Sequence, residues 1–354
     1  MNIRLRWLRD KLNALNIQGM IVSNPVNIKY LTNINAEGEL LITRKENVFI
    51  TDGRYIEEVN SALTIGDGVV VCDRKNMMRE DYENHFIFCE TVGFEEGYVT
   101  FEKYKYMKQL YKVNDFVETE HIIEKQRILK EKEEIEAIEK ACQLTDDCFS
   151  HIVKYIQKGM TERQIADEIE RYFKQNGADG LAFETIVASG ENSSKPHSLV
   201  TDRKIQSGDI ILMDFGCRYH GYCADMTRTI FVDKMSDHMK KVYDLVLRNQ
   251  ENVLQEMKEN ANLKTITKMV ENDFQMYHCD LIHALGHGVG LEIHELPVIS
   301  SRRDFFLKEN MVLAVEPGIY IPGKFGIRIE DTVKLTKNGC IKLTNSEKNY
   351  IIIS

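Results

Sequence analysis

Two aspartates interrupt a pair of otherwise apolar, strand-like segments, and this feature constrains the fold more than any other. Asp214 lies in the segment 208–215 and Asp225 lies in the segment 222–232. If the two segments form an antiparallel hairpin that turns at residues 219–220, the aspartates face each other directly, with Cβ atoms about 4.5–5.5 Å apart. Two ionised carboxylates at that separation repel each other strongly unless a cation lies between them.

A second pair of apolar segments repeats the pattern. Glu316 lies in the run 311–321 and Glu330 in the run 326–336, and a Pro322-Gly323 turn joins the two runs. A hairpin centred on that turn brings the two glutamates opposite each other. An edge-strand surface position would explain one acid, but it explains poorly four acids in two apolar hairpins. About two divalent cations would balance the four charges.

Histidines are concentrated in one glycine-rich segment. His283, His287 and His294 lie within residues 283–295, where three glycines at alternate positions disfavour a helix. The spacing suits backbone that passes close to something bulky, such as a metal site or a substrate. A phosphate-binding loop is the alternative, but no helix-plus-lysine pattern follows. One imidazole with four carboxylates suits manganese, cobalt, iron or zinc better than a soft-metal site or calcium.

The remaining histidines carry less weight. His197 lies in the loop-forming sequence Pro196-His197-Ser198 and is a weak functional candidate by itself. His121, His151 and His278 are expected to be structural, because a lone histidine usually is.

Composition and charge exclude several classes of protein. The chain has 354 residues and a net charge of −9, without the basic footprint of a nucleic-acid binder. We find no apolar run near the roughly 18 residues that a membrane span needs, and no signal-peptide core. Eight cysteines occur without a C-x-x-C pair, so we expect free thiols and a cytoplasmic location. A disulfide between Cys217 and Cys223 is disfavoured, because the two side chains point to opposite faces of the expected hairpin.

The pattern of elements predicts two domains. Residues 1–122 alternate short helices and strands, which indicates a small α/β domain, and a charged linker then runs into a long helix. Residues 123–354 read as α+β with mostly antiparallel strands. A capping box at Thr161 and a stop at Gly177 delimit one helix of this domain, and further helices are expected at about 236–258 and 263–277.

These segments together resemble a known family, the metallopeptidases with the pita-bread fold, which include methionine aminopeptidase, aminopeptidase P and prolidase. The matching stretches span most of the second domain in the family's order: 213–216, 221–229, 286–295, 316–320 and 328–331. Residues 30–33 and 51–55 resemble the N-terminal creatinase-type domain of the proline-specific branch, where an arginine also stands two residues before the last glutamate, as Arg328 does here. The resemblance implies a catalytic pita-bread domain preceded by a smaller α/β domain.

The resemblance also assigns the metal ligands. It implies that Asp214 binds one metal, that His287 and Glu316 bind the other, and that Asp225 and Glu330 bridge the two. Manganese is the expected metal, with cobalt, zinc and iron as alternatives.

Catalytic and substrate-binding roles follow from the same resemblance. His197 would assist the leaving group, His294 would stabilise the carbonyl or the oxyanion, and Glu316 would transfer the proton of the attacking water. His283 and Arg328 would line the pocket for the proline side of the substrate. Ser198 and Leu296 stand where the family usually has glycine and alanine, which affects the shape of the pocket and no metal ligand.

The expected activity is therefore hydrolysis of the Xaa-Pro bond at the N-terminus of dipeptides or short peptides by metal-activated water. We prefer an Xaa-Pro dipeptidase, and the alternative is an aminopeptidase P that acts on longer peptides. Methionine aminopeptidase is disfavoured by Arg328 and by the first domain, and a non-catalytic peptide-binding relative is disfavoured by the complete ligand set. A homodimer through the first domain is expected from the resemblance.

Overall fold

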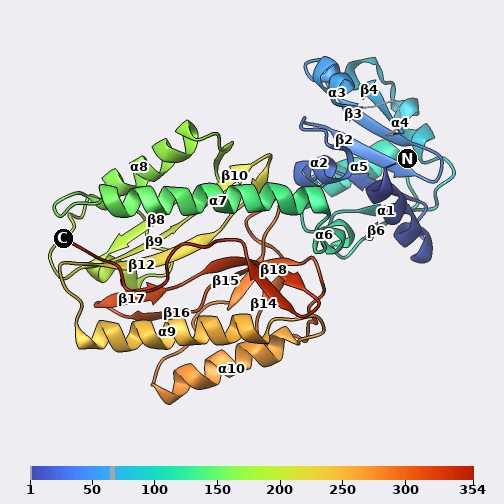
Figure 1. The fold of residues 1–354 in the computed structure, drawn as a ribbon. Helices are drawn as coiled ribbons and strands as arrows, with labels where there is room; N and C mark the ends of the chain where they lie inside the picture. The colour runs from blue at the N-terminus through green and yellow to red at the C-terminus, as the bar shows by residue number, and fades with distance from the viewer. Residues whose placement is uncertain (1, 64–67) are drawn as a thin grey trace. The chain divides into compact units, whose positions relative to one another are not determined.

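The structure is a computed structural model that describes residues 2–63 and 68–354, and it separates into two compact units, Met1–Arg127 and Ile128–Ser354 (Figure 1). The sequence pattern predicts a domain boundary at residue 122. The residues between the two positions form a helix, Ile122–Arg127, that lies within the first unit.

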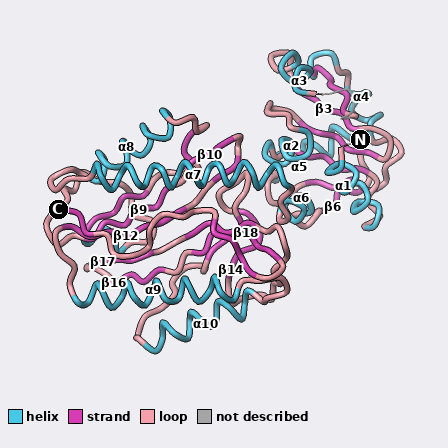
Figure 2. Tube along the Cα trace, in the orientation of Figure 1, coloured by secondary structure: helices cyan, strands magenta, loops and turns pink. Residues whose placement is uncertain are grey.

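The first unit is built on a mixed sheet with the strand order β4-β3-β2-β1-β5-β6 (Figures 1 and 2). Its strands are β1 (Gly19–Val22), β2 (Glu39–Thr43), β3 (Asn47–Thr51), β4 (Val69–Asp73), β5 (Thr91–Phe94) and β6 (Asp115–Glu118). Its helices are α1 (Ile3–Ala14), α2 (Pro25–Thr32), α3 (Ile56–Ala62), the 3-10 helix η1 (Arg74–Asn76), α4 (Arg79–His85), α5 (Phe101–Tyr111) and α6 (Ile122–Arg127). The leucines expected on one helical face, Leu5, Leu8 and Leu12, are buried on α1.

Strand direction in this sheet reverses at only one strand. β1 is parallel to β5 and antiparallel to β2, and β2 is antiparallel to β3. The pairs β3–β4 and β5–β6 are parallel. The chain therefore runs from β1 through β2 and β3 to β4 at one edge of the sheet, and then from β5, next to β1, to β6 at the other edge. Such a topological switch point opens a crevice at the carboxyl ends of the two strands.

A buried carboxyl group fixes the loop at this switch point. Glu95 follows β5 and accepts hydrogen bonds from the backbone N–H of Ser23 at 2.5 Å and of Asn24 at 2.8 Å, and from Asn27 Nδ2 at 2.7 Å. Burial raises the pKa of Glu95 to about 7, although these donors act in the opposite direction.

The second unit combines four α-helices and one 3-10 helix with several largely antiparallel sheets. Its helices are α7 (Lys132–Tyr155), α8 (Glu162–Gln175), the 3-10 helix η2 (Gly190–Ser194), α9 (Asp237–Glu256) and α10 (Leu263–Met276). Its first strands are β7 (Gly180–Leu181), β8 (Ile186–Ser189), β9 (Ile210–Phe215), β10 (Cys217–Tyr219), β11 (Tyr222–Cys223) and β12 (Met226–Val232). The later strands are β13 (Gly286–Gly288), β14 (Glu295–Ile299), β15 (Val312–Val315), β16 (Gly318–Ile321), β17 (Phe325–Arg328), β18 (Asp331–Thr336), β19 (Gly339–Lys342) and β20 (Ile352–Ile353).

Helices cover both sides of these strands. Figure 1 shows α7 and α8 on one side and α9 and α10 on the other, and each pair seals a separate apolar core. Ile211, Met213 and Phe215 of β9 pack into the core that includes α7 and α8. Because side chains alternate along a strand, Asp214 points away from that core. The alternation therefore places the acid on the inner face of the sheet.

The register of the first carboxylate hairpin differs from the prediction. Asp214 pairs with Thr227 rather than with Asp225, because the chain turns at His220 and Gly221. Both residues have positive φ, 50° and 84°, which a two-residue hairpin turn of type I′ requires. The predicted register is thus wrong by two residues, an even number. Asp214 and Asp225 remain on the same face, as diagonal rather than direct neighbours.

The second hairpin has the predicted register. Pairs on both sides of the acids, Val315 with Asp331 and Gly318 with Arg328, continue one alignment around a turn at Gly323. Glu316 and Glu330 lie between these two pairs, opposite each other in the alignment.

Two sequence expectations about the whole chain can be compared with the structure. All eight cysteines are free, as expected. Among the residues that the structure describes, no helix combines the length and the apolar character needed to cross a membrane.

Glu95 generates a prediction about pH. Because the pKa of its carboxyl group is higher in the folded protein than in the unfolded chain, its contribution to stability is full below about pH 4.5 and is lost as the pH rises through about 7. Between pH 5 and pH 8 the loss amounts to about 2 kcal/mol.

Urea unfolding at the two pH values, followed by circular dichroism, measures this loss. The variant Glu95→Gln cannot ionise, so its stability should change less over the same interval than that of the unmodified protein. Equal pH dependence of the two proteins would contradict the assignment.

Candidate metal centre

Three of the expected metal ligands converge in the interior of the second unit. Asp225, between β11 and β12, His287 on β13 and Glu330, between β17 and β18, each offer a ligand atom, and these atoms all lie within 4.8 Å of one another. All three side chains are buried. His287 Nε2 lies 3.5 Å from Asp225 Oδ2 and 3.6 Å from Glu316 Oε1, so Glu316 adjoins the same group.

The orientation of the His287 ring suits metal binding. Nδ1 lies 3.0 Å from the carbonyl oxygen of Gly288, to which it donates as the protonated nitrogen. Nε2 then carries the lone pair and faces the acids. Burial lowers the pKa of His287 to about 4, and the neighbouring His294 adds to this effect, so the ring is neutral at physiological pH.

Three of the acids each have one oxygen atom without a partner in the described part of the chain. Asp214 Oδ1, Asp225 Oδ1 and Glu330 Oε1 are buried and have no hydrogen-bond partner among the described residues. Burial, followed by repulsion from the neighbouring carboxylates, raises the pKa of Asp225 and of Glu330 well above their usual values. Unpaired oxygen atoms around one imidazole match the donor set of a hard or borderline divalent cation, so these residues fit a metal site.

Asp214 lies at the edge of this group and is tied to Arg328. Its Oδ2 accepts a hydrogen bond from Arg328 Nη2 at 2.5 Å. Arg328 also donates to Thr227 Oγ1, Tyr320 OH and the carbonyl oxygen of Pro196, and it is only 3% exposed. Most of its donors are therefore used within the protein. Arg328 therefore holds the Asp214 carboxylate in position.

Tyr320 extends this network, and the sequence analysis did not single it out. Its hydroxyl accepts from Arg328 Nη1 at 2.6 Å and lies 3.0 Å from His283 Nε2. His283 Nδ1 lies 2.7 Å from the carbonyl oxygen of Ala284. Tyr320 thus connects two of the residues that the resemblance assigned to the substrate. Its place in the Glu316-Pro-Gly-Ile-Tyr320 segment was the only signal for it.

The two other candidate histidines are exposed. The rings of His294 and His287 pack in a T-shaped arrangement, with centroids 4.4 Å apart. His197 has no hydrogen bond among the described residues. Burial lowers the pKa of His283 and of His294, and the nearby His197 lowers both slightly further. The structure therefore groups His197, His283 and His294 on one side of the metal centre, with His197 and His294 exposed and His283 partly buried.

A buried carboxylate that the sequence analysis missed holds the loop that carries His197. Glu162, at the first turn of α8, is fully buried. It accepts from the backbone N–H and hydroxyl of Ser189, from Asn192 Nδ2, and from the N–H and hydroxyl of Thr201. These partners lie at both ends of the loop. Glu162 therefore fixes the loop endpoints from which His197 is presented.

A second buried network supports Glu330. Arg228 donates to the carbonyl oxygen of Glu330 and forms a buried ion pair with Asp331, 2.6 Å long. Asp331 also accepts from Gln250 at 3.0 Å and pairs with Lys348 at 3.1 Å. The backbone on the far side of Glu330 is consequently locked to α9 and to the C-terminal segment.

Glycines at the site make room for neighbouring backbone. A Cβ atom on Gly216 would lie 1.8 Å from the carbonyl oxygen of Ala224, and one on Gly288 would lie 2.2 Å from that of Leu296. For Gly288 the close neighbour is therefore an adjacent strand, not a substrate or a metal as the alternating glycines suggested.

Comparison with known proteins places both units in described families. Residues 136–337 match the model of metallopeptidase family M24, and residues 4–129 match that of the creatinase/prolidase N-terminal domain. An Xaa-Pro dipeptidase of Pyrococcus furiosus is 35% identical over 357 residues, which cover 99% of this chain and all of that protein.

Solved structures agree over the same length. An Xaa-Pro dipeptidase from Bacillus anthracis is 32% identical with a TM-score of 0.94, and the match covers 99% of each chain. An X-Pro aminopeptidase from Thermotoga maritima is also 32% identical, with a TM-score of 0.87, and the match covers 97% of this chain and 100% of that one.

The Glu162 network predicts an effect on the His197 loop. Glu162→Gln leaves one oxygen and one amide group facing five hydrogen-bond donors, which should cost about 1–3 kcal/mol. We expect faster hydrogen exchange in residues 190–201, measured by mass spectrometry. Glu170→Gln on the same helix, whose carboxylate is partly exposed beside Lys174, is the matched control. Unchanged exchange in the loop would refute the role of Glu162.

Proposed function

Because the chain belongs to metallopeptidase family M24 and carries a creatinase/prolidase N-terminal domain, we propose that it hydrolyses the Xaa-Pro bond of dipeptides. Membership of the family and the fold class confirm the resemblance seen in the sequence motifs. The observation that carries the proposal is the cluster of Asp225, His287 and Glu330, with unpaired, buried carboxylate oxygens, in a chain that matches Xaa-Pro dipeptidases over its full length.

Five side chains would hold the metal ions: Asp214, Asp225, His287, Glu316 and Glu330. Asp225, His287 and Glu330 would supply ligand atoms from the cluster itself, and Asp214 and Glu316 would add theirs from its sides. When bound, the ions would polarise the scissile carbonyl group and lower the pKa of water to near neutrality. Manganese is our preferred metal, with cobalt, zinc and iron as alternatives that the same donor set supports.

The protein's own residues supply the proton transfers. Water attacks the carbonyl carbon that precedes proline, and Glu316 accepts the proton that the water loses. The same proton passes to the prolyl nitrogen, since a tertiary amide nitrogen leaves well only when protonated. The C–N bond then breaks and releases the first residue and the proline-containing product. His197, exposed on its fixed loop, would assist at the leaving nitrogen.

His294 and His283 would orient the substrate. His294 beside His287 could donate to the developing oxyanion, a contact that typically contributes about 3–4 kcal/mol per donor. His283 and Arg328, joined through Tyr320, would form the wall on the proline side. Arg328 would act there mainly by holding Asp214 and Tyr320 in place, because most of its donors already have partners.

The alternative is an aminopeptidase that removes the first residue from longer X-Pro peptides. The X-Pro aminopeptidase of Thermotoga maritima and the Bacillus anthracis dipeptidase are equally similar to this chain, at 32% identity each. This equal identity supports the aminopeptidase as the second candidate function. We further propose a homodimer, on the family resemblance, and a cytoplasmic location, which the eight free thiols support.

Asp225→Asn tests the metal centre. Removal of one ligand charge should lower both the metal content, measured by mass spectrometry, and kcat/KM for Ala-Pro, the latter by more than about a hundredfold. Asp147→Asn on the exposed face of α7 controls for the substitution itself. A well-folded Asp225→Asn protein that hydrolyses Ala-Pro at the normal rate without metal would end the proposal.

A substrate comparison tests the specificity. With manganese or cobalt added, we expect hydrolysis of Ala-Pro to exceed that of Ala-Pro-Ala, and Met-Ala to resist cleavage. Faster hydrolysis of Ala-Pro-Ala would replace the dipeptidase by the aminopeptidase. Preferential cleavage of Met-Ala would contradict proline specificity altogether.

A further inference from the structure

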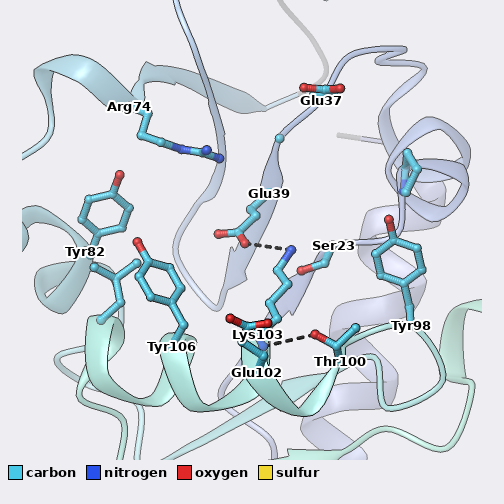
Figure 3. A pocket seen from close by; sticks show the side chains of 13 residues that line it. Ser23, Glu37, Glu39, Arg74, Tyr82, Tyr98, Thr100, Glu102, Lys103 and Tyr106 are labelled. Carbon is cyan, nitrogen blue, oxygen red and sulfur yellow. Dashed lines mark hydrogen bonds and ion pairs between the residues drawn. The ribbon is translucent and has the colours of Figure 1, made fainter.

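A cavity of about 650 Å³ opens in the first unit, and the metal centre has no part in it (Figure 3). It lies at the switch point of the six-stranded sheet. Ser23 follows β1, Tyr98 and Thr100 follow β5, and Arg74 follows β4, so the carboxyl ends of three parallel strands line it. Small molecules bind preferentially in crevices of this kind, and the volume lies in the usual range of 300–1,000 Å³.

Most polar groups at the floor of this cavity already have partners. Glu39 forms an ion pair with Lys103 Nζ at 3.1 Å and accepts a hydrogen bond from the hydroxyl of Tyr111 at 2.9 Å. Thr100 accepts from the backbone N–H of Lys103 as the cap of α5. These contacts make a preformed wall that requires no ligand to stabilise it.

Two polar groups have no such partner. The side chain of Arg74 forms no ion pair or hydrogen bond within residues 2–63 and 68–354, and Figure 3 shows its guanidinium directed towards the middle of the cavity. Ser23 is 4% exposed, and its buried hydroxyl has no hydrogen-bond partner among the described residues. The unsatisfied buried hydroxyl of Ser23 indicates a missing polar partner, and the exposed guanidinium of Arg74 offers a positive charge to a ligand in the same cavity.

The charges of the lining select the class of ligand. Two cations, Arg74 and Lys103, stand against three carboxylates, Glu37, Glu39 and Glu102. The net negative charge would repel a doubly charged phosphate. A zwitterion fits instead, because its carboxylate can pair with Arg74 while its ammonium group faces the acids. Tyrosine rings on the cavity wall offer an apolar surface to its side chain.

We propose that this cavity binds the zwitterionic backbone of a free amino acid or short peptide, with the carboxylate on Arg74. The ligand would be bound by a site separate from the hydrolytic one, and its recognition depends on both terminal charges rather than on a proline ring. A free amino acid and a dipeptide share this chemistry, and direct binding measurements distinguish them.

Isothermal titration calorimetry on the full-length, metal-loaded protein provides the test. Alanine and Ala-Ala, in millimolar concentration, are the ligands, and the tighter of the two identifies the natural source. Alaninamide lacks the carboxylate and N-acetylalanine lacks the ammonium group, so both should bind at least about tenfold more weakly.

Arg74→Ala should weaken binding of the preferred ligand by about tenfold or more. Lys75→Ala is the matched control, because it removes an equal charge from the same exposed turn without touching the cavity. Any binding at the metal centre is common to both variants and cancels in this comparison. Thermal midpoints of the two variants establish that both are folded.

Crystals of the same protein soaked with the preferred ligand locate it directly, and density between Arg74 and Ser23 is the expected result. Equal affinities of the Arg74→Ala and Lys75→Ala proteins, or no binding of either ligand at millimolar concentration, would overturn the proposal.

Discussion

Mutual repulsion of buried carboxylates is the constraint around which the second unit is organised. Asp225 and Glu330 are almost completely buried beside Glu316, and one oxygen atom of each has no hydrogen-bond partner among the described residues. A fold that collects acids in this way must either protonate them or bind cations. The surrounding structure leaves little freedom to relieve the repulsion by movement. Arg328 holds Asp214 from one side, and Arg228 holds the backbone of Glu330 from the other.

Much of this organisation could be predicted from the sequence, since it depends on local rules. The Pro322-Gly323 turn set the register of the second hairpin, and the capping box of Thr161 marked the start of α8. Alternation along the strands placed the acids on one face even though the first hairpin was misaligned. That error arose because tyrosine and histidine were assigned to the turn, whereas the left-handed backbone belongs to His220 and Gly221.

The supporting contacts could not be predicted in this way, because they join residues distant in the sequence. Glu162 appeared only as part of a helix start, although it fixes both ends of a loop that lies beyond the next strand. Tyr320 and Arg328 are eight residues apart, but the link from Arg328 through Tyr320 to His283 depends on how two strands and a loop fold together. In the first unit, likewise, the cavity arises from strand order, which local sequence patterns do not encode.

The absence of a side chain at Gly216 has a mechanical consequence. Because the carbonyl oxygen of Ala224 occupies the space that any Cβ atom would need, the backbone segments next to Asp214 and Asp225 approach each other closely just beyond the acids. The close approach of the two backbones, rather than the length of a side chain, therefore sets the distance between those acids. Any side chain at Gly216, which supplies no ligand atom, would therefore change the distance between two of the expected metal ligands.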